Sequence, residues 1–276
     1  MNASGTMHMG PPSPQSTRMR EVDDMSAESR HQEILQLLGQ KGTLSIAELG
    51  ERFEVSDMTI RRDLTVLASE GLLVRTRGGA AASASGSFEP PFVLRERTNA
   101  GAKQQIAAAA AAQVIDGQTV LLDGGTTGLA IAEALLGRNL TVCALNVRVA
   151  QVLAADSSMR VMVPGGTIRP GEFSVVGPEA LAMVSSFRFD VYLMTASGLS
   201  VDAGVTEWNT DDAAVKRAAL DASRRTVLVA DARKFGAEAF VRVCPISRVD
   251  RLVTDAGLAD EHRRELAATG TELVVA

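Results

Sequence analysis

Ser56-Asp57-Met58-Thr59-Ile60-Arg61-Arg62-Asp63-Leu64 is the stretch that decides how the first part of this chain folds. Ser56 is a good helix N-cap, because its hydroxyl can accept a hydrogen bond from a backbone N–H of the first turn. Ile60, Leu64 and Leu67 then recur at helical spacing and form one apolar stripe. The pattern predicts an amphipathic helix that begins after Ser56.

The other face of this helix carries polar and basic side chains. Thr59, Arg61 and Arg62 lie off the apolar stripe, where hydroxyl and guanidinium groups can donate to the phosphates and base edges of DNA. Taken alone, the stretch fits an ordinary amphipathic helix with a solvated charged face better than a DNA-reading helix. Its neighbours in the sequence favour the DNA-binding interpretation.

Two short helices are expected before this stretch. Ile34, Leu37 and Leu38 share one face of the first helix. Ser45 can cap the second helix, and Glu48 follows three residues later, as a capping box requires. Two short helices and a tight turn before a longer third helix predict a helix-turn-helix, in which the last helix reads the DNA groove.

The segment after the third helix is expected to form a wing. The helix should end near Glu70, with Gly71 as its stop, and residues 72–80 read as a strand followed by a glycine turn. Arg75 and Arg77 alternate along the extended segment and should therefore share one face, as residues that contact phosphates in a wing would.

The whole chain is acidic, with 276 residues and a formal net charge of -5. No overall basic field draws it to nucleic acid, so any DNA affinity has to come from local clusters such as these arginines. Cys143 and Cys244, the only cysteines, match neither a zinc site nor a disulfide framework. We therefore expect a reducing, cytoplasmic location and no metal or other cofactor.

Changes in composition predict the domain boundaries. Residues 1–25 mix Ser, Pro, Gly and Met without periodicity or the apolar core of a secretory signal, and we interpret them as a disordered extension. Residues 26–80 form the DNA-binding domain, residues 81–92 a linker rich in small residues and proline, and residues 93–276 a second domain. No apolar run approaches the ~20 residues that span a bilayer, so no membrane association is expected.

The second domain alternates short apolar runs with helical patterns. Leu94 to Val114 reads as one long helix, and later helices are expected at residues 129–136, 147–155, 211–223 and 261–269. Strands are expected at residues 119–122, 141–144, 160–163, 191–195, 226–230, 251–254 and 273–275. This alternation predicts an α/β domain with a mostly parallel sheet and helices on both faces.

The loops after these strands carry the unusual residues. Asp123-Gly124-Gly125-Thr126-Thr127-Gly128 joins a strand to a helix, and its glycines, hydroxyls and helix N–H groups suit a phosphate. Such a turn can also serve connectivity alone, and the absence of Gly-Lys-Ser/Thr excludes a nucleotide P-loop. Asn146, Gly166 and Ser197 follow other strands and should meet this loop at one edge of the sheet. The small polar set suits a phosphorylated, hydroxylated small molecule.

These motifs together resemble the DeoR family of sugar-metabolism repressors. In the first domain the resemblance rests on residues 34–38, 46–49, 55–64 and 71–80, above all on Thr-Ile-Arg-Arg-Asp-Leu. It implies a winged helix-turn-helix that binds double-stranded operator DNA. By position in the motif, the DNA-contacting residues would be Ser56, Thr59, Ile60, Arg61 and Arg62 in the recognition helix and Arg75 and Arg77 in the wing.

In the second domain the resemblance rests on Asp123-x-Gly125-Thr126-Thr127, Gly165-Gly166-Thr167, Ala196-Ser197-Gly198 and Asp231-x-x-Lys234-Phe235-Gly236. In the family this domain looks like ribose-5-phosphate isomerase and binds phosphorylated sugars or related metabolites as inducers. The resemblance implies a ligand site that comprises Asp123, Gly125, Thr126, Thr127, Asn146, Gly166, Ser197, Lys216 and Lys234.

The roles of four residues stay open at this point. Asp63 could orient one of the neighbouring arginines or form a simple ion pair within its helix. Lys216 and Lys234 could contact a ligand or be ordinary solvated side chains. Trp208 could cover the pocket, although core or interface packing is the default expectation for a tryptophan.

We therefore expect a repressor of carbohydrate-metabolism genes that a phosphorylated sugar or polyol releases from DNA. It should be a homo-oligomer, a dimer or a tetramer, because one winged domain reads only a short site. One alternative is a sugar-phosphate isomerase fused to a DNA-binding domain. Isomerases of similar fold place a catalytic Glu where Val215 stands, so we expect no catalytic residue. Another alternative is a constitutive DNA-binding oligomer without a ligand, which the glycine and threonine turns disfavour.

Overall fold

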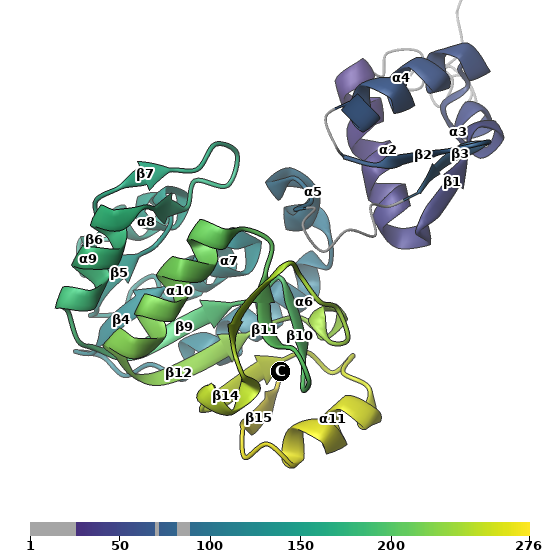
Figure 1. Cartoon of the computed structure of the whole chain (residues 1–276). Coiled ribbons are helices and arrows are strands. Elements are labelled where there is room, and N and C mark those ends of the chain that lie inside the picture. The colour runs from purple at the N-terminus through teal and green to yellow at the C-terminus, as the bar shows by residue number, and fades with distance from the viewer. Residues whose placement is uncertain (1–25, 70–71, 82–88) are drawn as a thin grey trace, which may run out of the picture. The chain divides into compact units, whose positions relative to one another are not determined.

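The computed structural model describes residues 26–69, 72–81 and 89–276. The chain divides into two compact units, Met1–Ser83 and Ala84–Ala276 (Figure 1). The expected disordered extension, the expected helix stop at Glu70 and Gly71, and residues 82–88 of the expected linker lie outside the described residues.

The N-terminal unit is a winged helix-turn-helix, as predicted. Ser45 and Glu48 form the expected capping box, and Ser56 Oγ accepts from the Thr59 N–H at 3.2 Å. Its sheet has three antiparallel strands in the order β1-β3-β2, and β1 was not expected. The elements in chain order are α2 (Ala27–Lys41), β1 (Thr43–Ser45), α3 (Ile46–Phe53), α4 (Asp57–Ser69), β2 (Val74–Thr76) and β3 (Gly79–Ala81).

A single apolar cluster holds this unit together. The predicted stripe of α4, formed by Ile60, Leu64 and Leu67, is fully buried against side chains of α2 and α3. Each such side chain contributes about 1.5–3 kcal/mol when it leaves water. Gly79 lets β3 approach β1, because a Cβ at this position would lie only 1.9 Å from the Leu44 carbonyl oxygen.

Asp63 lies on the inner side of α4, which corrects both interpretations made from the sequence. Its carboxylate accepts from Arg30 Nε at 2.7 Å and lies 2.9 Å from His31 Nε2, and both partners belong to α2. Burial alone would raise the pKa of Asp63, but the hydrogen bonds from Arg30 and His31 hold that pKa below its ordinary value. Asp63 therefore binds α4 to α2 rather than pairing with Arg61 or Arg62.

The second unit is built on a seven-stranded sheet in the order β15-β14-β12-β9-β4-β5-β6, and all its strands are parallel. The predicted α/β fold class is thus confirmed. The strands are β4 (Thr119–Leu122), β5 (Thr141–Ala144), β6 (Arg160–Met162), β9 (Phe189–Thr195), β12 (Ser223–Val229), β14 (Arg251–Thr254) and β15 (Glu272–Val275).

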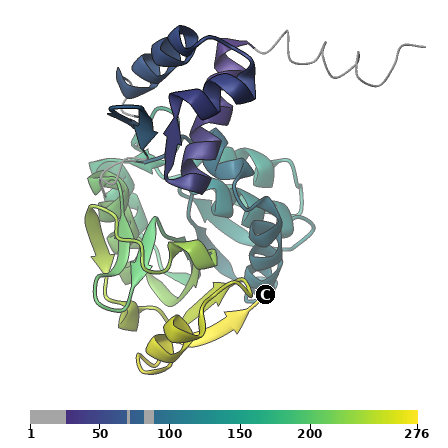
Figure 2. The same ribbon diagram turned by 90° about the vertical axis from the view of Figure 1, so that its right-hand side faces the viewer.

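Helices cover both faces of this sheet (Figures 1 and 2). Strand residues alternate between the two layers, so Val120 and Leu122 pack on one side and Leu121 on the other. One layer contains α6 (Ala100–Ala111), α7 (Gly125–Ala134) and α8 (Val147–Ala154), and the other contains α9 (Pro178–Ser186), α10 (Thr210–Ala222) and α11 (Asp260–Ala267).

The expected long helix over residues 94–114 is wrong, since the chain forms α5 (Phe92–Arg97) and then α6. Asn99 separates the two helices with φ of 57°, a left-handed conformation that Asn tolerates better than most residues. Lys103 is buried and donates to the Thr98 carbonyl at 2.8 Å, which stabilises the break. Arg95 at the end of α5 can then point towards the sheet.

Several short strands were not anticipated because each spans only a few residues. They form a hairpin of β7 (Thr167–Ile168) and β8 (Val175–Val176) and an antiparallel sheet of β10 (Gly198–Ser200), β11 (Gly204–Glu207) and β13 (Val241–Cys244). Within the described ranges, no helix combines the length and apolar character needed to cross a membrane.

Gly79→Ala is expected to destabilise the N-terminal unit, because the added methyl group would push β3 away from β1. Overpacking of this kind costs about 1–3 kcal/mol, which would lower the urea midpoint of this unit in circular dichroism. Gly78→Ala is the matched control, because a Cβ there meets nothing within 4 Å. Equal midpoints for the two variants would contradict the expectation.

Asp63→Asn is expected to loosen α4 from α2. Because the folded-state pKa of Asp63 lies below its unfolded value, the stabilisation from its charge is complete above the unfolded pKa and is lost as pH falls through the folded pKa. The difference in unfolding free energy between wild type and variant should therefore shrink below about pH 5. A difference that stays constant in acid would show that the Asp63 charge does not stabilise the unit.

Candidate functional site

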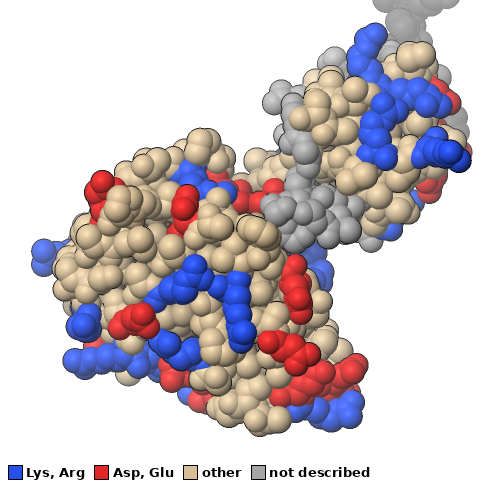
Figure 3. All heavy atoms as spheres, in the orientation of Figure 1, with Lys and Arg blue, Asp and Glu red and all other residues tan. Residues whose placement is uncertain are grey.

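The outer face of α4 carries the predicted DNA-contacting residues. Arg61 and Arg62 are exposed and Thr59 is half-buried. Ser56 Oγ and Thr59 Oγ1 lie 3.0 Å apart at the start of the helix, which is the end that enters the groove in this motif. Figure 3 shows Lys and Arg side chains gathered on this unit over the region of α3 and α4.

Three members of the predicted set are placed differently. Ile60 is 0% exposed, so its side chain packs α4 against the core and its assignment as a DNA contact is wrong. Arg75 lies in β2 and donates from Nη1 to Thr65 Oγ1 of α4 at 2.9 Å. Arg77 is exposed in the turn after β2, so the two arginines do not share a strand face as expected. Arg75 instead connects the wing to the recognition helix.

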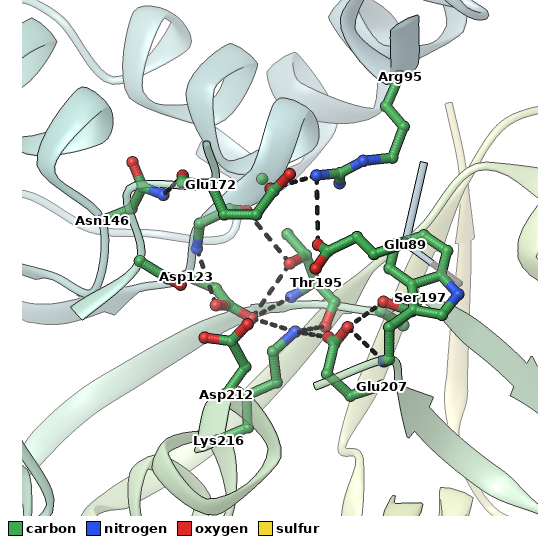
Figure 4. Close-up of a pocket in the computed structure, with 15 residues that line it drawn as sticks. Glu89, Arg95, Asp123, Asn146, Glu172, Thr195, Ser197, Glu207, Asp212 and Lys216 are labelled. Carbon is green, nitrogen blue, oxygen red and sulfur yellow. Dashed lines mark hydrogen bonds and ion pairs between the residues drawn. The ribbon is translucent and has the colours of Figure 1, made fainter. Parts of the chain in front are cut away.

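A second candidate site lies where the strand order of the large sheet reverses. The strands β4, β5 and β6 proceed towards one edge and β9, β12, β14 and β15 towards the other, so β4 and β9 are neighbours at the switch point. Loops leave such a point in opposite directions and open a crevice. A cavity of about 50 Å³ lies here, and the loops after β4 and β9 contribute to its lining (Figure 4).

Asp123, the first residue after β4, organises the floor of this cavity. Its Oδ2 accepts from the Thr195 N–H at 3.0 Å, from Thr195 Oγ1 at 3.1 Å and from the Tyr192 hydroxyl at 3.3 Å. Its Oδ1 accepts from the Gly124 N–H at 2.8 Å. A carboxylate only accepts hydrogen bonds, so Asp123 could bind ligand hydroxyls but would repel a phosphate.

Lys216 of α10 is only 5% exposed and is therefore no solvated surface residue. Its Nζ lies 2.9 Å from Asp123 Oδ2 and 2.6 Å from Glu207 Oε2, and it donates to the Thr195 carbonyl at 2.8 Å. Burial alone would lower the pKa of Lys216, but the two carboxylates raise that pKa well above its ordinary value. The ammonium group therefore stays charged and joins both carboxylates into one network.

The start of α7 supplies the features that attract an anion. Gly124 and Gly125 line the cavity, and Gly124 has no side chain to cap the helix. Backbone N–H groups in the first turn of a helix favour negative charge. Arg95 adds a positive charge there, because its Nη1 lies 3.7 Å from the position that a Cβ on Gly125 would occupy.

Ion pairs close the rim of the cavity (Figure 4). Arg95 binds Glu172 and lies 3.4 Å from Glu89 Oε1, while Arg169 donates to Glu89 Oε2 at 2.8 Å and also pairs with Asp212. Burial and the neighbouring charge of Glu172 raise the pKa of Glu89. The rim thus contains two cations and three carboxylates.

The structure brings together part of the predicted ligand set. Asp123, Gly125, Asn146, Ser197 and Lys216 all line the cavity. The remaining members do not line it. Thr126 and Thr127 lie within α7, Gly166 follows β6, and Lys234 packs with its Nζ 4.7 Å from the Trp208 ring centre.

Trp208 itself lines the cavity and is only half-buried, so it is not a core residue, and its expected role in an interface stays a prediction. Burial lowers the pKa of the adjacent Lys234 to about 8. Asn146 acts through other groups: its Oδ1 accepts from the Arg148 N–H at the start of α8, and its Nδ2 donates to the Glu172 carbonyl at 2.8 Å. Its predicted contact with a ligand stays a prediction.

Several lining residues were missed in the sequence. Thr195 ends β9 and could have been found by the same strand-end rule that selected Ser197. The charged ones had no such signal, because their partners are distant in sequence. These are Glu89, Arg95, Glu172, Glu207 and Asp212.

The side chains permit either binding or proton transfer. Val215 packs in the core and supplies no base, but five carboxylates line the cavity: Glu89, Asp123, Glu172, Glu207 and Asp212. The lack of a base at one position therefore does not by itself exclude an isomerase. Each of the five carboxylates is held in an ion pair with Arg or Lys, an arrangement that suits a binding site.

Comparison with known families identifies both units. The model of the DeoR-like helix-turn-helix domain matches residues 30–85 of this chain. The model of the DeoR C terminal sensor domain matches residues 98–256. The two matches fall on the winged unit and on the unit that contains the cavity.

Individual proteins give the same result. The chain is 38% identical over 233 residues to the glycerol-3-phosphate regulon repressor of Escherichia coli (strain K12), which covers 84% of this chain and 92% of that protein. It is 34% identical over 235 residues to the HTH-type transcriptional repressor CsqR of the same strain, with coverage of 85% and 90%. The solved structure of ribose 5 phosphate isomerase A from Neisseria gonorrhoeae is only distantly similar, with 18% identity, a TM-score of 0.35 and coverage of 49% of this chain and 53% of that chain. The chain belongs to the DeoR family of transcriptional regulators.

Proposed function

We propose that this protein is a transcriptional repressor that binds a double-stranded DNA operator through α4 and the β2–β3 wing. A phosphorylated sugar or polyol in the second unit would release it from the DNA. The observation that carries the proposal is that one chain combines outward-facing Arg61 and Arg62 on α4 with a polar cavity at the start of α7. Two similar proteins are named repressors, one of them of the glycerol-3-phosphate regulon.

The chemistry of the cavity supports this class of effector. Gly124 and Gly125 at the start of α7 suit a phosphate, whereas Asp123 and Ser197 suit ligand hydroxyls. We further propose that the protein acts in the cytoplasm as a dimer or tetramer, because two or more winged DNA-binding domains are needed for useful sequence specificity.

The isomerase alternative is weaker, although the cavity holds carboxylates. Membership in a family of regulators supports binding rather than turnover. The alternative of a constitutive DNA-binding oligomer leaves the charged cavity without a role. Both alternatives can be tested with the same purified protein.

Arg61→Ala and Arg62→Ala are each expected to weaken operator binding about 10- to 100-fold, since a guanidinium at a base edge contributes about 1–3 kcal/mol. The operator is first selected from random duplexes with wild-type protein, and affinities are then measured by fluorescence anisotropy at fixed salt. Lys41→Ala is the matched control, because it removes an exposed cation of the same unit outside α4 and the wing. Equal losses in all three variants would refute α4 as the groove reader.

Phosphorylated sugars and polyols, glycerol 3-phosphate among them, are expected to raise the melting temperature and to release the selected operator. A compound at about 100 times its Kd adds about 2.7 kcal/mol, which corresponds to about 5–10 °C for a domain of this size. Glycerol and inorganic phosphate serve as control compounds, because each carries only one of the two parts of glycerol 3-phosphate. If no phosphorylated compound stabilises the protein, the sensor role is wrong, and turnover of ribose 5-phosphate would favour the isomerase.

A further inference from the structure

The cavity at the start of α7 is too small for the effector class that we propose. Its volume is about 50 Å³, which a few water molecules would fill, whereas small-molecule pockets measure about 300–1,000 Å³. A sugar phosphate can therefore enter only if side chains of the lining move.

A second cavity, of about 450 Å³, lies next to this inner one. Arg148, Arg169 and Phe92 contribute to its lining. Glu89 and Glu172 line both cavities and thus form the wall between them. Removal of one of these side chains would join the two spaces into a pocket of the size that a small metabolite needs.

Glu89 is held in this wall by two arginines. Its Oε2 accepts from Arg169 at 2.8 Å, and its Oε1 lies 3.4 Å from Arg95, which also binds Glu172. The side chains of Glu89, Arg95 and Arg169 are between 16% and 19% exposed, so water can still reach these ion pairs. They can exchange one anion for another more easily than the fully buried network below them.

Of the two wall residues, Glu89 is better placed to move. The backbone around Glu172 is anchored, because its carbonyl accepts from Asn146 Nδ2 at 2.8 Å and the carbonyl of Phe173 accepts from the Val147 N–H at 2.9 Å. The hydrogen bond next to Glu89 along the chain is donated by Arg95 Nε to the Pro90 carbonyl at 2.7 Å, so it comes from an arginine that would itself change partner. The Glu89 carboxylate is also close enough to Glu172 for the two charges to repel, which together with burial raises the pKa of Glu89.

The position that Glu89 occupies attracts anions through two arginines. Arg95 and Arg169 supply two guanidinium groups, and Arg95 lies beside Gly125 at the positive end of α7. A phosphate offers more acceptor oxygens and more charge than one carboxylate, and arginine binds both groups in the same bidentate manner.

We propose that Arg95 and Arg169 bind the anionic group of the effector and that Glu89 is an internal competitor, which occupies this subsite until the effector displaces it. Displacement joins the two cavities and breaks the ion pairs that hold the chain at Glu89. This residue lies eight residues beyond the end of β3 at Ala81. Effector binding thereby acts on the segment that leads to the DNA-binding unit. This inference rests on the proposed function of the second unit as a phosphometabolite sensor.

Glu89→Gln tests the competition, because it removes the charge and keeps the size of the side chain. Glu96→Gln is the matched control, as it removes an exposed carboxylate from the neighbouring α5 that lines neither cavity. Binding of glycerol 3-phosphate and of inorganic phosphate is followed by the fluorescence of Trp208, the only tryptophan of the chain. Its ring centre lies 5.4 Å from the Arg95 guanidinium carbon and should respond when Arg95 changes partner.

Glu89→Gln should bind the phosphorylated probe about tenfold more tightly than wild type. This factor corresponds to the free energy of about one charged hydrogen bond, which the Glu89 carboxylate makes in wild type and which the probe has to replace. The selected operator should be released at a correspondingly lower probe concentration. Glu96→Gln should match wild type, and Arg169→Gln should bind the probe more weakly.

Equal affinities of wild type, Glu89→Gln and Glu96→Gln would overturn the inference and leave the sensor function intact, because wild type would still respond to the probe. Failure of wild type to bind any phosphorylated compound would overturn both proposals.

Hydrogen exchange of the wild-type protein gives an independent test if a variant does not fold. The amide of Arg95, which donates to the Pro91 carbonyl at 3.1 Å, should exchange faster with the probe bound, and stronger protection there would contradict displacement of Glu89.

Discussion

The ammonium group of Lys216, buried between Asp123 and Glu207, is the interaction on which the candidate ligand site depends. It connects α10 to the loop after β4 and to the end of β11, and through the Thr195 carbonyl it also reaches the end of β9. Removal of one partner from a buried ion pair leaves an uncompensated charge and costs several kcal/mol. The residues at the switch point of the sheet are therefore held in one arrangement by each other.

The rim of the same site follows a different principle. Its ion pairs involve long side chains that water still reaches, so their geometry can be exchanged at a smaller cost in free energy. A regulator needs two states of similar free energy, and a ligand shifts them only by its unequal affinity for the two. The arrangement that we propose, in which the Lys216 network keeps its geometry while the ion pairs of the rim change partner, meets both requirements.

The parts of this protein that were predicted correctly are those that depend on neighbours in the sequence. Ser45 with Glu48 and Ser56 with Thr59 are interactions within one helix turn, and both are present. The strands at residues 119–122 and 141–144 follow from short apolar runs and have the expected bounds. Two of the errors concern partners far away along the chain. Asp63 binds α2 across the core, and Lys216 finds its carboxylates on other elements.

The sequence by itself determined the winged helix-turn-helix, the α/β class of the second unit and the strand-end loop at Asp123, because helix caps, apolar periodicity and glycine turns act over a few residues. Only the tertiary structure decided which charges meet. Glu89 and Arg169 are 80 residues apart, and Arg95 and Glu172 are 77 apart. The free energy of a charged side chain depends on what surrounds it in space, and a chain shows those surroundings only after the sheet has brought its strand ends together.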